Sequence, residues 1–143
     1  MDEAFIKKVQ PNSPEAEQSV IGAMIMDRDA IADVIDIVNA DDFYQKQNGI
    51  LFEAMTELYR EGKPVDLVTL QNKLKKKDVP ESMKSLEFIR DLLEAVPTSA
   101  NAKQYAKIVS EKATLRKLIK VTEDITTECY LGKDDVTEIL DHT

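Results

Sequence analysis

Few side chains in this sequence combine the type and the spacing that catalysis requires. The only histidine, His142, is one residue from the end of the sequence, so a metal site or a Ser-His-Asp triad built on it would depend on a fraying terminus. Cys129 has no neighbouring histidine, and its place in a long helical pattern predicts a small, partly buried apolar residue. Neither residue is therefore predicted to be catalytic.

Two pairs of acidic residues have the spacing that brings side chains to one face of a helix. Glu53 and Glu57 are four residues apart, and Asp33 and Asp36 are three apart. Neighbouring carboxylates can bind a divalent cation or divide the roles of acid and base. Because the chain contains 27 acidic residues, such pairs also arise by chance, and we expect both to be solvated. We predict no catalytic residue, no metal site and no cofactor in this chain.

The sequence also lacks the motifs that bind phosphate groups. Residues 62–64 and 132–134 each contain a Gly-Lys pair, but neither has the upstream glycine or the following Ser/Thr of a P-loop. Four lysines, at positions 73, 75, 76 and 77, have no aromatic residues interleaved for stacking on bases. We expect this run to be a solvated helix terminus rather than a contact with nucleic acid.

The composition excludes several classes of protein. With 19 basic and 27 acidic residues among 143, the net charge of −8 argues against a surface that neutralises many phosphates. A single cysteine cannot form an internal disulfide and indicates a reducing cytoplasm. No apolar run approaches the ~20 residues that a membrane span needs, and the acidic N-terminus does not resemble a secretory signal. Only 4 glycines and no tryptophan favour an all-α protein over one rich in hairpin turns.

Helix signals begin early in the chain. Ser13 and Pro14 suit the N-cap and the first helical position, and the apolar spacing that follows predicts a helix over residues 14–26. A polar break at residues 27–29 separates it from a second helix that reaches Asn39. The remaining predictions for the first hundred residues are a loop anchored in the core by Phe43 and Tyr44, a helix over residues 45–61 ended by Gly62, a helix capped by Asp66, and a helix over residues 82–95.

A different pattern follows residue 100. Residues 102–129 contain neither glycine nor proline and predict a helix of roughly 42 Å, followed by a reversal at residues 130–134 and a final helix. Residues 1–100 carry a net charge of −7 and residues 101–143 a net charge of −1. We therefore predict an all-α fold with a compact multi-helix head (1–100) and a long αα-hairpin (101–143), whose second arm is truncated by the end of the sequence.

The long helix combines charged and apolar residues in a way that suits a binding surface. Arg116, Lys117 and Lys120 form a basic ridge close to Ile119 and Ile125. An exposed apolar pair beside charge is typical of protein–protein interfaces. The alternative is that this helix packs onto the first hundred residues, and the sequence leaves both possibilities open.

Several strings in this sequence resemble the N-terminal domain of DnaB-type bacterial replicative helicases. The similarity runs in order from about residue 11 to residue 140, and it includes Phe88 where many relatives have tyrosine. The strings are EAEQSVIGA (15–23), DFY (42–44), PVDLVTL (64–70), VPTSAN (96–101), YAKIV (105–109) and LRKLI (115–119).

The resemblance implies a collar domain with no catalysis of its own, joined in the family to a RecA-like ATPase that alone would bind ATP and magnesium. In this family the hairpins of neighbouring subunits associate, forming a trimer of dimers in the hexamer, and the C-terminal helicase-binding domain of primase docks on the collar. By position, the primase contacts fall at Phe88, Arg116, Ile119 and Ile125.

Self-association is predicted at apolar residues of the hairpin, namely Tyr105, Ile108, Leu115, Ile139 and Leu140. A helicase loader is a further candidate partner, whereas direct contact with nucleic acid or a membrane is not expected. The resemblance places the protein in the bacterial cytoplasm at the replication fork. The rival hypothesis is a stand-alone helical adaptor or regulator, which would have no Walker A motif downstream in the same reading frame.

Overall fold

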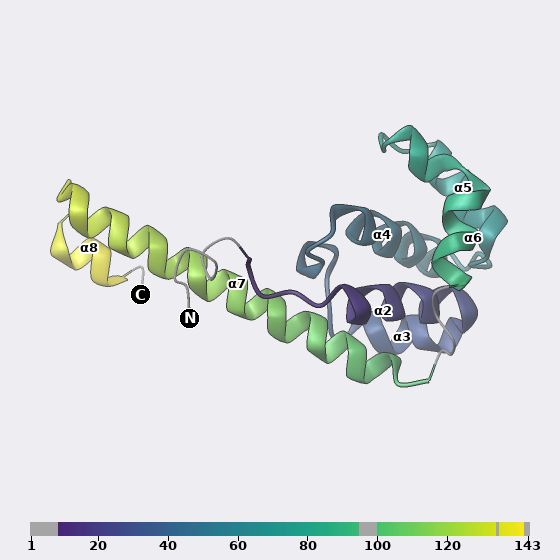
Figure 1. Cartoon of the computed structure of the whole chain (residues 1–143), viewed down its shortest axis with the longest axis horizontal. Helices are drawn as coiled ribbons and strands as arrows, with labels where there is room; N and C mark the ends of the chain where they lie inside the picture. Colours follow the sequence, from purple (N-terminus) through teal and green to yellow (C-terminus); the bar gives the residue numbers. More distant parts are fainter. Residues whose placement is uncertain (1–8, 95–99, 134, 142–143) are drawn as a thin grey trace.

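The computed structural model describes residues 9–94, 100–133 and 135–141, and these residues form helices and connecting turns without a strand (Figure 1). The elements are α2 (Pro14–Met26), α3 (Arg28–Ile35), the 3₁₀ helix η1 (Ala40–Asp42), α4 (Lys46–Arg60), α5 (Leu67–Lys75), the 3₁₀ helix η2 (Glu81–Lys84), α6 (Leu86–Glu94), α7 (Ala102–Leu131) and α8 (Val136–Asp141). The all-α prediction is confirmed. Position 95 of the predicted helix over residues 82–95, position 134 of the predicted reversal and the terminal His142 lie outside the described residues.

Helix α2 begins as its sequence predicts. The Ser13 side chain accepts a hydrogen bond from the backbone N–H of Ala16 (3.2 Å), and Pro14 is the first helical residue. The break before α3 is shorter than predicted, because Asp27 alone is non-helical and its Oδ1 accepts the N–H of Asp29 (3.0 Å) to cap α3. Helix α3 ends at Ile35, four residues before the predicted limit, since the chain then turns toward η1.

Helix α4 is capped by a residue from another helix. Its own N-cap residue, Gln45, makes no capping hydrogen bond with its side chain. Instead the carboxylate of Glu17 on α2, which is 2% exposed, accepts the N–H groups of Tyr44 (2.8 Å) and Gln45 (3.2 Å) and the side-chain amide of Asn48 (3.1 Å). The negative charge lies at the positive end of the α4 dipole. Glu17 therefore joins α2 to α4.

The approach of η1 to α4 depends on a glycine. A Cβ atom at Gly49 would lie 2.7 Å from the backbone oxygen of Ala40, a distance at which η1 would have to move. This close approach lets Phe43 enter the core, where its ring centroid lies 5.3 Å from that of Phe52. The prediction that Phe43 anchors this turn is confirmed, but Tyr44 remains 42% exposed and does not enter the core.

Ion pairs connect α4 to α5. Asp66 caps α5 by accepting the N–H of Thr69 (2.8 Å), as its position predicts. Two lysines of the run at 73–77 are not simply solvated: Lys73 Nζ lies 2.8 Å from a carboxylate oxygen of Glu61, and Lys77 Nζ lies 2.8 Å from one of Glu57. Glu57 of α4, which the sequence predicted to be solvated, thus pairs with Lys77, just after the end of α5.

The helix predicted over residues 82–95 is two elements. Ser85 is extended (φ −84°, ψ 144°) and separates η2 from α6. Its hydroxyl accepts the N–H of Phe88 (3.2 Å), which caps the first turn of α6. Serine competes for backbone hydrogen bonds and therefore favours such a cap over a helix interior. Helix α6 then packs on α2 and α5, with Ile89 fully buried.

Helix α7 has two parts with different surroundings. Its first part, residues 102–113, which we call the packed segment, lies against α2 and α3 (Figure 1). The residues that it buries are small: Ala102, Ala106, Val109 and Ala113. Small side chains let helices approach closely. This part of α7 completes the core of the head and so crosses the boundary predicted at residue 100.

The second part of α7, residues 114–131, extends away from the head, and we call it the projecting segment (Figure 1). Gly132 ends the helix in the left-handed conformation (φ 61°), which glycine adopts without strain. Helix α8 then folds back along the end of α7. The projecting segment and α8 together form the arm of the molecule.

Candidate interaction surface

The arm exposes apolar side chains that the head leaves uncovered. On α7, Leu118 is 56% exposed and Val121 is 43% exposed. Helix α8 has only six residues and buries none of them. The other large apolar residues exposed on the arm are Leu115, Tyr130, Leu131, Val136 and Leu140. Exposed apolar groups gathered on one element make the arm a candidate interaction surface.

Spacing on the helix divides these residues into faces. Leu118, Val121 and Ile125 follow one another at intervals of three and four residues, so they form one stripe. Ile119 lies two residues before Val121, about 200° around the helix, and is on a different face. Ile119 and Ile125 are both partly buried. The two isoleucines of the predicted primase surface therefore do not share a stripe.

Arg116 makes its polar contacts inside the chain. Its Nη1 donates to the backbone oxygen of Pro11 (2.8 Å) and its Nη2 to that of Asp42 (2.7 Å). The guanidinium carbon lies 5.4 Å from the centre of the Tyr44 ring. Lys117 Nζ lies 3.5 Å from Oδ1 of the buried Asp42. Two of the three cations predicted to form a ridge thus join α7 to the head, while Lys120 pairs with Asp124 of its own helix (3.5 Å).

The structure separates Phe88 from the arm. Phe88 is partly buried in the first turn of α6, which lies at the opposite end of the head from the projecting segment (Figure 1). Within one chain, Phe88 therefore does not lie beside Ile119 or Ile125. A partner that uses all of these residues must make at least two separate contacts.

The residues predicted for self-association also fall into two groups. Tyr105 and Ile108 belong to the packed segment and are partly buried against the core of the head. Leu115 is 44% exposed at the start of the projecting segment, and Leu140 is 67% exposed on α8, where Ile139 is partly buried. The sequence did not single out Leu118 or Val121. Their apolar character was visible, but their exposure depends on where the head ends.

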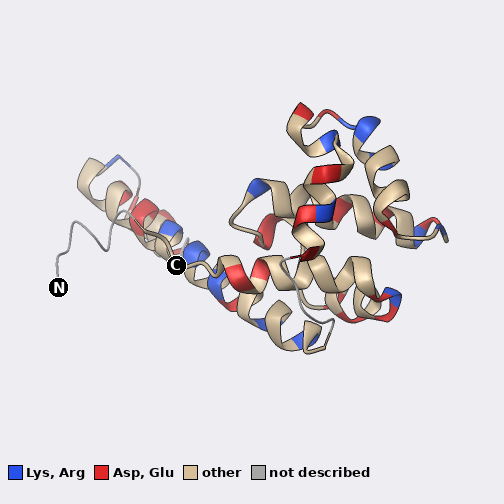
Figure 2. Ribbon diagram, turned by 45° about the vertical axis from the view of Figure 1, so that its right-hand side comes forward, with Lys and Arg blue, Asp and Glu red and all other residues tan. Residues whose placement is uncertain are grey.

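The prediction for Cys129 is wrong in one respect. Its side chain is exposed rather than partly buried, because the helix has left the head well before residue 129. Acidic and basic residues are interspersed along this part of α7, as Figure 2 shows. Its surroundings in the described structure contain no group of His, Cys, Asp or Glu that could hold a metal ion.

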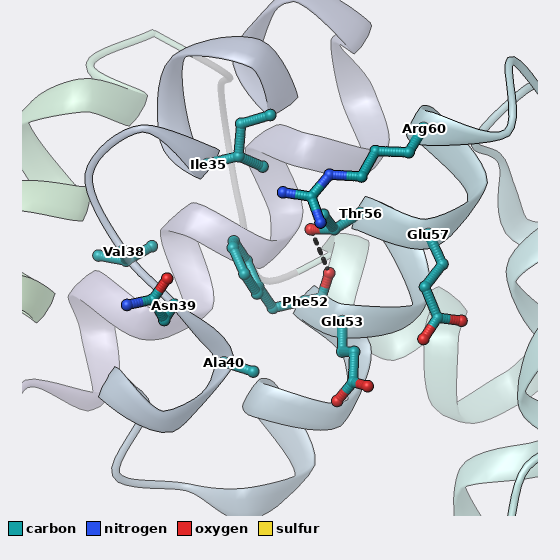
Figure 3. Close-up of a pocket in the computed structure, with 9 residues that line it drawn as sticks. All are labelled: Ile35, Val38, Asn39, Ala40, Phe52, Glu53, Thr56, Glu57 and Arg60. Atoms are coloured by element: carbon teal, nitrogen blue, oxygen red, sulfur yellow. Dashed lines mark hydrogen bonds between the residues drawn. The ribbon is translucent and has the colours of Figure 1, made fainter.

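A pocket of about 250 Å³ lies between α4 and the turn that follows α3 (Figure 3). Glu53, Glu57 and Arg60 stand on its rim, and the hydroxyl of Thr56 in its wall already donates to the carbonyl oxygen of Phe52 (2.8 Å). The volume is below the roughly 300–1,000 Å³ of ligand pockets. Since Glu57 is also paired with Lys77, the pocket offers no free constellation of acid and base.

The described helices include none that is long and apolar enough to cross a membrane.

Together these features define an all-helical domain whose most distinctive surface is a projecting helical hairpin. Comparison with known proteins identifies the class. The family model for the DnaB-like helicase N terminal domain matches residues 9–111, which include most of the packed segment. The chain belongs to this family.

Its relatives define the similarity more closely. The chain is 37% identical over 141 residues to the replicative DNA helicase DnaB of Geobacillus stearothermophilus, an alignment that covers 99% of this chain and 31% of the relative. The chain thus spans less than a third of that helicase's length and is a homologue of its N-terminal domain.

Two solved structures have the same fold. The N-terminal domain of DnaB helicase from Mycobacterium tuberculosis matches with a TM-score of 0.87 and 36% identity, covering 93% of this chain and 94% of that one. The N-terminal domain of DnaB helicase from Helicobacter pylori, whose structure was described with its interactions with primase, matches with a TM-score of 0.70 and 23% identity. The alignment covers 91% of this chain and 99% of that one.

Proposed function

We propose that this chain is the collar domain of a bacterial replicative helicase, which assembles subunits through its arm and provides a docking surface for primase. The observation that carries the proposal is the projecting arm, whose apolar residues stay exposed although the head has a complete core. The domain performs no catalysis of its own. ATP, magnesium and DNA are handled by a motor domain, in the cytoplasm at the replication fork.

Self-association is assigned to the stripe that contains Leu118 and Val121, together with Leu115 and Leu140. Each CH₂ group removed from water contributes roughly 0.8 kcal/mol, so a few aliphatic residues on each of two arms suffice for a stable contact. Charge favours contact between arms over contact between heads. Residues 1–100 carry −7 and repel their copies, whereas residues 101–143 carry only −1. The two-fold contact between identical arms is self-complementary.

Primase docking is assigned to Ile119 and Ile125 with Arg116 nearby, and to Phe88 as a separate contact on the head. The C-terminal helicase-binding domain of primase is the proposed partner. Support comes from the family and from the Helicobacter pylori relative, which was described together with primase. Ile119 lies on a face of α7 different from that of Val121, so a partner bound at Ile119 leaves that stripe open to a second arm. Ile125 lies on the stripe itself, so the two proposed contacts meet there. A helicase loader is a further partner that this surface could serve.

The same substitution on two faces of one helix tests both assignments. Ile119→Asp should abolish binding of the primase C-terminal domain in calorimetry, because the charge would have to be desolvated at the contact. Val121→Asp should reduce the mass measured by light scattering to that of a monomer. Both variants should keep the helicity of the parent in circular dichroism, since neither side chain belongs to the core of the head.

Each variant is the other's control for the effect of an added charge on α7. Unchanged primase affinity for Ile119→Asp would contradict docking on this face. Unchanged mass for Val121→Asp would contradict self-association through the arm.

A further inference from the structure

Arg116 lies where α7 leaves the head. It binds the segment before α2 through the carbonyl of Pro11 (2.8 Å) and the end of η1 through the carbonyl of Asp42 (2.7 Å). These two partners are 105 and 74 residues away in sequence. The ring of Tyr44 lies beneath the guanidinium, 5.4 Å from its central carbon. One side chain therefore ties three distant segments together at the base of the arm.

The chemistry of this contact makes it rigid. A guanidinium is planar and always charged, and it presents its donors in a fixed fork. Both acceptors are backbone oxygens, which cannot rotate away as a side chain can. The group is partly buried, where a charge-assisted hydrogen bond is stronger than in water. Lys117 adds an ion pair to the buried carboxylate of Asp42 at the same place in the molecule.

Farther along α7 the next ion pair stays within the helix. Lys120 pairs with Asp124, and the hydroxyls of Thr122 and Thr126 donate to carbonyl oxygens of α7 itself. The direction of the arm is thus determined close to Arg116. The helix continues for about 15 residues, roughly 22 Å, so a tilt of about 15° at Arg116 would displace its end by roughly 6 Å.

We propose that Arg116 is a positioning residue, which fixes the direction of the arm relative to the head and thereby the placement of Ile119 and Ile125. This role differs from a direct charged contact with a partner. Two of the five N–H donors of the guanidinium already bond carbonyl oxygens of the chain, one from each terminal nitrogen, so the group is held in place without a partner. The effect on primase affinity rests on the proposed function, whereas the direction of the arm does not.

The only cysteine of the chain can carry a spin label, which allows the distance between head and arm to be measured. Cys129 is exposed near the end of α7, and Val68 on α5 is 59% exposed on the head. In a Val68→Cys parent, spin labels at both positions report the head-to-arm distance by pulsed electron resonance. Dilution with unlabelled protein restricts the signal to distances within one chain. The variants compared are Arg116→Ala, Arg116→Lys and Tyr44→Ala, with Lys120→Ala as the matched loss of a cation from the same helix.

We expect one narrow distance distribution in the parent and in Lys120→Ala. Arg116→Ala should broaden it, and Arg116→Lys should not restore it, because an ammonium cannot form the fork to two carbonyl oxygens. Tyr44→Ala should broaden it to a smaller extent and provides a second route should Arg116→Ala fold poorly. If the arm then has the binding direction about a tenth of the time, primase affinity falls about tenfold.

A distribution in folded Arg116→Ala or Tyr44→Ala that superimposes on that of the parent would overturn the proposal. A broadened distribution with unchanged primase affinity would leave the positioning role standing and contradict primase docking on the arm. Because the distances are measured without any partner, the two failures are distinguishable.

Discussion

The packed and projecting segments of α7 belong to one uninterrupted helix, yet only the packed segment buries any of its residues. The packed segment places alanines and Val109 against the head. The projecting segment leaves larger aliphatic residues such as Leu118 exposed. Hydrophobicity alone would rank the two segments the other way round. Burial in this helix follows from what lies beside each turn, and small residues are buried because they allow α2 and α3 to approach.

This difference in burial assigns the stability of the fold to the packed segment and the binding of other proteins to the projecting segment. The packed segment contributes to the core of a single chain, so damage there should unfold the head. The projecting segment buries no residue, so apart from the polar contacts of Arg116 and Lys117 with the head, damage there should change only what the arm binds. Substitutions placed in one segment or the other test this comparison through their effects on unfolding and on self-association.

The largest effect is expected from Val109→Asp, compared with Val121→Asp on the same helix. Val109 is 2% exposed and Val121 is 43% exposed. Burying an unpaired carboxylate should lower the free energy of unfolding by about 4 kcal/mol, whereas a surface substitution should change it by less than about 0.5 kcal/mol. Urea denaturation at a concentration where the chain is monomeric measures both. Equal losses for the two variants would show that the arm is part of the folding core.

The next test uses Glu17, which caps α4 and joins two helices of the head. Its loss should lower the stability of the head without changing what the arm binds. Glu17→Ala leaves the N–H groups of Tyr44 and Gln45 without their acceptor and should cost about 3 kcal/mol. Glu17→Gln keeps an acceptor but loses the charge at the helix terminus, and should cost less. Urea denaturation ranks the two variants. Light scattering should show the same self-association as the parent once each variant is folded, and its loss would couple head to arm.

The smallest effect is a dependence of head stability on acid. The ammonium of Lys73 and then that of Lys63 lower the pKa of Glu61 from 4.5 to about 2, and Lys77 is the main cause of the lowered pKa of Glu57. A carboxylate whose pKa is lowered on folding stabilises the folded state above its unfolded pKa. This contribution is lost as the pH falls from 4.5 toward about 2.

The substitution Lys73→Met should flatten the pH dependence of the urea midpoint in that range. Lys75→Met, at an exposed lysine of the same helix, is the control and should keep the parent's profile. A profile for Lys73→Met identical to that of the parent would show that the pairing between α4 and α5 contributes nothing to stability.

Local signals predicted most of the helices. Ser13 and Pro14 began α2, Gly62 followed α4, Asp66 capped α5, and the absence of glycine and proline marked α7. These features act within a turn or two, so a single sequence reveals them. The break at Ser85 and the early end of α3 were missed, since apolar spacing continues through both.

The candidate surface was only partly predictable. Ile119 and Ile125 were identified from their place beside basic residues on the long helix, and the family resemblance implied the same positions. Leu118 and Val121 were not identified, because exposure depends on where α2 and α3 stop covering α7. Arg116 appeared as part of a basic ridge, whereas it contacts carbonyl oxygens of Pro11 and Asp42. No periodicity encodes a contact between residues so far apart.

By itself the sequence determined the helical class, the order of the helices and the family, since capping, periodicity and motif strings are local properties. Only the tertiary structure decided that Glu17 caps another helix and that α7 changes from core to arm. It also decided that Arg116 stands at that transition. The physical reason is that burial and long-range hydrogen bonds depend on which helices meet, and the chain's own periodicity does not specify its neighbours.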